Sequence, residues 1–261
     1  MTRTRMLGGI AAIVIVAALA ARPAAAAQMY VAMGDSYASG VGTRTYTADS
    51  GSCQRSPLAY APRLAAQLGY TLTFVACAGA RIGDVTANQL SALGASTSFV
   101  TISIGGNDAG FSKVITQCAK PWPFTCWGDL DNAQAFIRST LPGQLDGLYA
   151  QIRSRAPAAH VVVVGYPRVF NGKDTCNAAA RISAGEQARL NDTADLLAAT
   201  TRARAQAHGF GFVDAIPSFV GHAVCDSPEW INGLSSPVSE SYHPKVAGYD
   251  DYVSLLAPVL R

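Results

Sequence analysis

The feature that most constrains the fold is an alternation of short, apolar, often β-branched runs with longer alanine-rich stretches of helical period. Strands are predicted at Met29–Gly34, Leu72–Ala76, Phe99–Ile104, His160–Gly165 and Phe210–Asp214. The fourth run contains four consecutive valines, which suits a strand buried on both faces. Strands that alternate with helices predict an α/β fold with a parallel sheet covered on both sides.

The stretches between these strands carry helix signals. Helices are predicted at Leu58–Leu68, Ala133–Arg155, Ser183–Ala207 and from about Lys245 to the C-terminus. Gly69 follows the first as a C-cap, and Pro142 with Gly143 interrupts the second. Residues 28–261 contain no repeat and no long linker, and they are numerous enough for one domain with a full core.

The first 27 residues have the order of a secretory signal peptide. Arg3 and Arg5 give a positive start, Leu7–Ala21 is apolar, and Ala24–Ala27 supplies small residues for cleavage. The alternative is a retained membrane helix, but the apolar core is shorter than the roughly 20 residues that a spanning helix needs. We therefore expect residues 1–27 to be removed and the remaining domain to be secreted.

Removal of this segment changes the charge balance. The chain has 20 Lys and Arg against 17 Asp and Glu, and residues 1–27 contain Arg3, Arg5 and Arg22 but no acid. Subtracting these three leaves 17 of each sign, a formal net charge of zero. No basic field remains to attract nucleic acid, so nucleic acid is not expected as a partner.

Six cysteines in an exported chain indicate oxidation and disulfides. The sequential pairing is favoured, namely Cys53–Cys77, Cys118–Cys126 and Cys176–Cys225. A zinc site is the alternative, but no two cysteines have the Cys-x-x-Cys spacing and no His-x-x-x-His pair accompanies them. The sequence therefore predicts no metal site.

One serine lies where the first strand ends, in Gly34-Asp35-Ser36-Tyr37. Open α/β sheets bind ligands at the carboxyl ends of their strands, which makes Ser36 a candidate nucleophile. The alternative is an ordinary turn, in which Asp35 and Ser36 hydrogen-bond the local backbone. Asp35 is expected to shape the turn.

The next two strands also end in residues that suit acyl transfer. Gly79 follows the second strand and Asn107 follows the third, in Gly105-Gly106-Asn107-Asp108. Such chemistry needs donors aimed at the developing oxyanion, and the amides of Ser36 and Gly79 with the Asn107 side chain fit that need. The alternatives are tight-turn geometry for the glycine and an Asx-type cap for the asparagine.

A serine nucleophile needs a base, and histidine is the residue suited to this near neutral pH. The chain has four histidines: His160, His208, His222 and His243. The first begins an apolar strand and the second ends a helix, so both suit structural roles. His243 lies in Ser241-Tyr242-His243-Pro244 before the terminal helix and is the favoured base, with His222 second.

These residues together resemble the GDSL, or SGNH, hydrolase family. The matching blocks are Gly34-Asp35-Ser36, Gly79, Gly105-Gly106-Asn107-Asp108 and His243, in the family's order. The resemblance is strongest to secreted actinobacterial lipases, esterases and phospholipases A1, which share the three sequential disulfides. It implies a flavodoxin-like three-layer α/β/α sandwich around a parallel five-stranded sheet, without metal or cofactor. By this resemblance Ser36 is the nucleophile, Gly79 and Asn107 are oxyanion donors, and His243 is the general base.

One block departs from the family pattern. The family usually has aspartate three residues before the histidine, where this chain has Glu240. Either Glu240 orients the imidazole as a triad acid, or a main-chain carbonyl, that of Ser241, accepts the Nδ1 hydrogen bond. The second alternative, a Ser–His dyad, is favoured.

Aromatic and apolar residues in the loops indicate an acyl site. The residues in question are Tyr37, Phe111, Ile115, Trp122, Phe124, Trp127 and Trp230. As a set they favour a lipid ester as substrate. The enzyme is separately expected to be a monomer that touches lipid surfaces transiently. The alternatives are a carbohydrate acetylesterase of the same fold and, less favoured, a secreted binding protein without catalysis.

Overall fold

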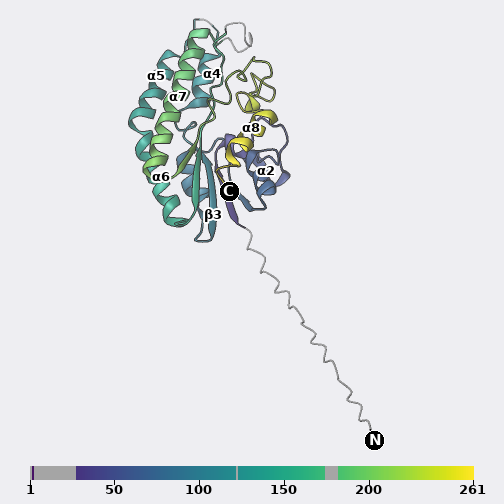
Figure 1. Ribbon diagram of the computed structural model, residues 1–261. Helices are drawn as coiled ribbons and strands as arrows, with labels where there is room; N and C mark the ends of the chain where they lie inside the picture. Colours follow the sequence, from purple (N-terminus) through teal and green to yellow (C-terminus); the bar gives the residue numbers. More distant parts are fainter. Residues whose placement is uncertain (1, 3–27, 122, 174–181) are drawn as a thin grey trace.

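The computed structural model (Figure 1) describes Thr2 and residues 28–121, 123–173 and 182–261. Its strands form one parallel five-stranded sheet in the order β2-β1-β3-β4-β5. They are β1 Met29–Gly34, β2 Thr71–Phe74, β3 Thr97–Ser103, β4 His160–Val164 and β5 Gly211–Val213. The predicted α/β fold with a parallel five-stranded sheet is confirmed, and the strand ends differ from the prediction by a few residues.

Helices cover both faces of the sheet (Figure 1). The α-helices are α1 Ser36–Ser39, α2 Tyr60–Leu68, α3 Ile82–Asn88, α4 Phe111–Cys118, α5 Trp127–Ser139, α6 Leu141–Arg155, α7 Ala184–Ala207 and α8 Val246–Leu256. Short 3₁₀ helices lie at η1 Ala48–Cys53, η2 Leu90–Ala92 and η3 Val238–Glu240. Alternate residues of β1 enter two separate cores: Tyr30 packs with α2 and α8, whereas Val31 packs with α3, α6 and α7.

The helix predictions hold in part. Gly69 caps α2 with a φ of 72°, as expected. The helix expected at Ala133–Arg155 is two helices that meet at Thr140, and Pro142 lies in the first turn of α6, where its missing N–H is tolerated. Ser183 caps α7 in a capping box with Glu186. Helices α3 and α4 follow the two glycine-rich strand ends and were not predicted.

Two of the predicted disulfides are present, Cys53–Cys77 and Cys118–Cys126. The first ties the end of η1 to the segment after β2, and the second joins α4 to the start of α5. Cys225 is also disulfide-bonded, whereas Cys176 lies outside the described residues, as does Trp122. Apart from Thr2, the predicted signal peptide falls on residues that likewise lie outside the described part of the chain.

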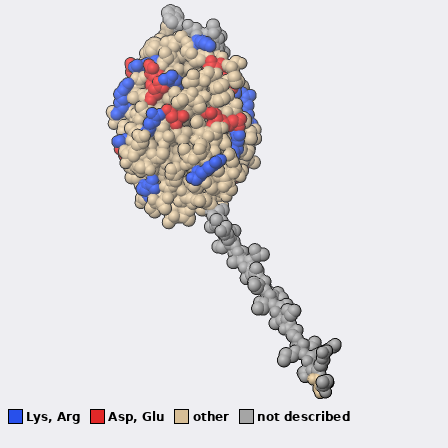
Figure 2. Space-filling model, in the orientation of Figure 1, with Lys and Arg blue, Asp and Glu red and all other residues tan. Residues whose placement is uncertain are grey.

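Basic and acidic side chains are interspersed on the face shown in Figure 2, in keeping with the balanced charge of residues 28–261. Within the described part of the chain, no helix is both long enough and apolar enough to cross a membrane.

Candidate active site

The turn that carries Ser36 is held tightly against the neighbouring strand. Gly34 ends β1 with a φ of 119°, and a Cβ there would lie 2.2 Å from the main-chain oxygen of Ser103. Only glycine fits such a position. Asp35 then caps α1 by accepting a 3.0 Å hydrogen bond from Tyr37 N, which leaves Ser36 as the first residue of that helix. The serine is thereby fixed at the carboxyl edge of the sheet.

His243 reaches this serine from the far end of the sequence. Its Nε2 lies 2.8 Å from Ser36 Oγ, and its Nδ1 lies 2.9 Å from the main-chain oxygen of Ser241. A carbonyl oxygen only accepts, so Nδ1 carries the hydrogen and Nε2 accepts from the serine hydroxyl. Burial lowers the pKa of His243 to about 4, and the hydrogen bond to Ser241 opposes this shift. The imidazole is therefore neutral near pH 7.

The loop that carries the histidine is anchored to the serine turn. Tyr37 OH donates a 2.7 Å hydrogen bond to the main-chain oxygen of Tyr242, and the Tyr37 and His243 ring centroids are 5.3 Å apart. Asn232 N donates to the main-chain oxygen of His243 at 2.9 Å. These contacts hold the imidazole against Ser36 from both sides of the loop.

The hydrogen bonds that Glu240 makes go to a loop and not to the imidazole. Glu240 is buried, and its two carboxylate oxygens accept hydrogen bonds from Gly42 N at 2.8 Å and from Tyr46 OH at 2.6 Å. The carboxylate thus holds the 42–46 loop, and among the described residues the acceptor that faces His243 Nδ1 is Ser241 O.

Two of the three expected oxyanion donors share a cavity. Ser36 is the first residue of α1, where N–H groups have no intrahelical partner. Asn107 Nδ2 donates one hydrogen to Ala80 O at 3.0 Å and keeps a second, and both Ser36 and Asn107 line the same cavity. Gly79 has a φ of 77° and is exposed, and it lines a neighbouring hollow beside the Cys53–Cys77 disulfide.

The cavity beside Ser36 is lined almost entirely by apolar atoms. Its apolar walls come from four regions: Phe111 and Val114 of α4, Ala133 and Ile137 of α5, Leu190, Ala194 and Leu197 of α7, and Tyr166, Pro167, Val169 and Phe170 after β4. Such a site suits a hydrophobic ligand.

Only part of the expected acyl lining is found here. Tyr37 and Phe111 line the cavity as expected. Ile115 is buried in the core, whereas Phe124 and Trp127 are 57% and 45% exposed. Trp230 lies elsewhere and stacks on His222 with ring centroids 3.5 Å apart. The lining residues that were missed are Val114 of α4, the segment after β4 and the residues of α5 and α7; in the two latter helices the lining residues recur regularly. Their apolar spacing of three and four residues predicts a helix face, but the spacing does not tell which cavity the face lines.

The other histidines lie apart from Ser36. His160 begins β4 and is exposed, and His208 Nε2 lies 3.0 Å from Asp146 Oδ1 at the end of α7. His222, the second candidate for the base, directs Nδ1 to Pro228 O at 2.8 Å. Among the described residues, His243 alone of the four hydrogen-bonds the serine.

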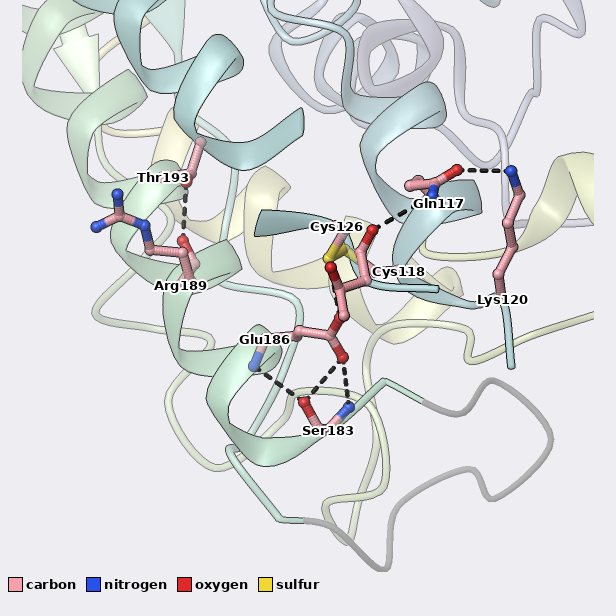
Figure 3. Close-up of a disulfide and its surroundings, with 9 residues drawn as sticks. Gln117, Cys118, Lys120, Cys126, Ser183, Glu186, Arg189 and Thr193 are labelled. Carbon is pink, nitrogen blue, oxygen red and sulfur yellow. Dashed lines mark hydrogen bonds between the residues drawn. A yellow bond between two sulfur atoms is a disulfide. The ribbon is translucent and has the colours of Figure 1, made fainter. Parts of the chain in front are cut away.

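One group of potential metal ligands occurs in the described part of the chain, at Cys118, Cys126 and Glu186. Figure 3 shows the two sulfur atoms joined in a disulfide, with the Glu186 carboxylate beside them. Glu186 Oε2 accepts from Ser183 N at 3.1 Å and from Ser183 Oγ at 2.8 Å. Because metal binding by cysteine needs thiolates, and both sulfur atoms here are in a disulfide, this group fits a structural cross-link and not a metal centre.

The sheet order, the helices on both faces and the serine–histidine contact together define the SGNH class of hydrolases. A model of the GDSL-like Lipase/Acylhydrolase family matches residues 32–250. Lipase 1 of Streptomyces coelicolor is 42% identical over 259 residues, which covers 95% of each chain. The chain belongs to the GDSL-like lipase/acylhydrolase family and is a carboxylic ester hydrolase.

Two solved structures support the same assignment. The extracellular lipase of Streptomyces rimosus superposes with a TM-score of 0.85 at 44% identity, covering 89% of this chain and 99% of the lipase. Phospholipase A1 of Streptomyces albidoflavus NA297 gives a TM-score of 0.85 at 42% identity, with the same coverage.

Proposed function

We propose that this protein is a secreted lipid ester hydrolase that works through an acyl-enzyme on Ser36. The observation that carries the proposal is the 2.8 Å contact between Ser36 Oγ and His243 Nε2, together with the apolar cavity that Ser36 lines. His243 takes the serine proton as Oγ attacks the ester carbonyl. The imidazolium then protonates the leaving alcohol, and a water molecule repeats the sequence on the acyl-enzyme.

The negative charge that forms on the carbonyl oxygen needs donors already in place. We assign this role to the Ser36 amide, to the second Nδ2 hydrogen of Asn107 and, from the family pattern, to the Gly79 amide. The Ser241 carbonyl orients the imidazole, which makes the catalytic pair a dyad. Its 2.9 Å contact with Nδ1 supports this assignment.

The apolar cavity supports a fatty-acyl chain as the part of the substrate that is bound. Among the described residues, its walls offer no charged side chain except Asp35, whose carboxylate is used in hydrogen bonds within the protein. The relatives at 42–44% identity are named a lipase and a phospholipase A1. We therefore propose an ester of a long-chain fatty acid, with phospholipid as the first substrate to test.

Secretion and contact with lipid surfaces belong to the same proposal. Two disulfides in the described residues fit an oxidising environment. The exposed ring of Phe124 lies within the disulfide-closed connection between α4 and α5, and that of Trp127 directly follows it; both helices contribute side chains to the cavity lining. We assign residues 1–27 as a secretory signal and these rings as the part that touches lipid.

The function is tested by labelling and product analysis. An organophosphate should label the folded protein once, at Ser36, and Ser36→Ala should abolish both labelling and hydrolysis. A phosphatidylcholine with different acyl chains at its two positions, analysed by mass spectrometry of the released fatty acid, identifies the ester that is cleaved. A folded protein that hydrolyses esters without labelling at Ser36 would overturn the assigned mechanism.

A further inference from the structure

We propose that Tyr166 is a positioning residue that fixes the distance between the Ser36 turn and the Asn107 loop. The proposal rests on the function given above, because it assigns a cause to the geometry of the oxyanion donors. Neither the motif blocks nor the serine–histidine pair includes this tyrosine. It follows β4, in the loop that leads towards α7, and its side chain lines the cavity beside Ser36.

The phenol oxygen of Tyr166 hydrogen-bonds both segments. It donates to Asp35 Oδ2 at 2.5 Å, and it lies 3.4 Å from Gly106 N, from which it accepts a longer hydrogen bond. Asp35 directly precedes Ser36, and Gly106 directly precedes Asn107. One oxygen atom therefore connects the neighbours of the two residues that we assign as donors to the oxyanion.

The surrounding packing keeps the phenol in this place. The ring of Tyr166 meets the ring of Tyr37 edge to face, with centroids 5.0 Å apart. A Cβ added at Gly106 would lie 3.4 Å from Tyr166 Cζ, which shows that the phenol packs directly beside this glycine. Tyr37 in turn donates to the main-chain oxygen of Tyr242, next to the histidine.

The protonation states favour the same hydrogen-bond direction. Burial and the nearby Asp35 carboxylate raise the pKa of Tyr166 well above its ordinary value, so the phenol keeps its hydrogen. Burial raises the pKa of Asp35 to about 7, and the hydrogen bonds from Tyr166, Tyr37 and Ala38 oppose this shift while Asp108 adds to it. The phenol thus stabilises the ionised carboxylate that caps the serine turn.

Loss of the Tyr166 hydrogen bonds should lower the rate of the reaction and leave the affinity for substrate unchanged. Preorganised donors stabilise the transition state only when their spacing matches the developing oxyanion. Loss of the phenol oxygen frees the two segments to move apart, whereas the ring still fills its part of the cavity wall. A short soluble ester should therefore bind as before and react more slowly.

The primary test is Tyr166→Phe, assayed with p-nitrophenyl butyrate. We expect kcat to fall about tenfold, in line with the loss of a hydrogen bond to a charged group, with KM unchanged within about twofold. The organophosphate should still label the variant to the full stoichiometry, although more slowly. Full labelling with a reduced kcat separates this proposal from the proposed function, which would fail through absence of labelling.

Two further variants complete the experiment. Tyr149→Phe is the matched control, because the Tyr149 hydroxyl is buried and has no hydrogen-bond partner among the described residues; its kcat should be unchanged. Asp35→Asn should lower kcat, and the double variant with Tyr166→Phe should lose no more than Asp35→Asn alone.

Three results would overturn the proposal: a wild-type kcat in Tyr166→Phe, a change in KM alone, or additive losses in the double variant. If Tyr166→Phe fails to fold, as judged by thermal unfolding, Asp35→Asn alone still tests the proposal. A wild-type kcat in that variant would show that the hydrogen bond between the phenol and Asp35 does not affect catalysis.

Discussion

His243 Nδ1 donates its hydrogen to the main-chain oxygen of Ser241, 2.9 Å away, and not to a carboxylate. A carbonyl fixes the tautomer and the ring orientation, but it carries no full negative charge to stabilise the imidazolium that forms during the reaction. The buried Glu240, which stands where the family usually has the triad acid, is used elsewhere.

Glu240→Gln should therefore retain most of kcat on a soluble ester. The substitution weakens the hydrogen bonds to Gly42 and Tyr46, so the expected effect is a lower melting temperature. Steady-state kinetics and thermal unfolding of the same preparation check both points. A fall in kcat near the ~10⁴-fold effect of disabling a triad acid would instead identify Glu240 as a participant in catalysis.

Asn107→Ala should lower kcat by ~10²–10³, the typical effect of removing one oxyanion donor. KM for a short ester should change little, because the side chain acts on the transition state. Asn88→Ala is the control, since Asn88 is exposed and lines the neighbouring hollow, not the cavity of Ser36. An Asn107→Ala variant with wild-type kcat would remove this residue from the oxyanion site.

The loss of kcat/KM that accompanies protonation of His243 should occur at an unusually low pH. Only neutral His243 accepts the serine proton, and burial lowers its pKa to about 4, against an ordinary value of 6.5. As the pH falls, His243 should therefore keep its capacity as a base below pH 6 and lose it only on approach to pH 4. Protonation of Asp35, whose burial raises its pKa to about 7, should add a separate and smaller decline near neutral pH. Stopped assays with a neutral ester on Asp35→Asn, which lacks this carboxylate, isolate the histidine, and a decline centred near pH 6.5 in that variant would show that the imidazole is not desolvated as described.

Ala194→Phe should shorten the preferred acyl chain. Ala194 lies on α7 and lines the apolar cavity, so a larger side chain there occupies space meant for the substrate. Hydrolysis of p-nitrophenyl palmitate should fall relative to the acetate ester. The exposed Ala199 of the same helix gives the control variant Ala199→Phe, which should keep the wild-type preference. Equal preferences in the two variants would contradict an acyl role for the cavity.

The sheet and the position of Ser36 were predictable because their signals are local. Each strand is a short apolar run, and the residues that follow a parallel strand must lie at one edge of the sheet. The contact of His243 with Ser36 had a weaker signal, since 207 residues separate the two in sequence. His243 was favoured over His222 from its place in a loop before the terminal helix, and the family pattern points to the same residue. No local signal brings His243 and Ser36 together.

The cavity wall was not predictable in the same way. Phe124 and Trp127 were expected in the acyl site because they are aromatic, yet both are exposed at the end of the α4–α5 connection. The real wall uses small and aliphatic side chains of α5 and α7, such as Ala133 and Leu197. Their placement depends on how two helices pack against each other, which the sequence of either helix alone does not specify.

The two outer strands of the sheet are short: β2 has four residues and β5 has three. Outer strands carry unpaired amide groups to which a second copy of a chain can add. Residues 28–261 have 17 charges of each sign, so two copies experience little mutual repulsion that would keep them apart. The brevity of these strands leaves an approaching copy few consecutive hydrogen bonds to form, which opposes the edge-to-edge addition of a second sheet where charge repulsion is weak.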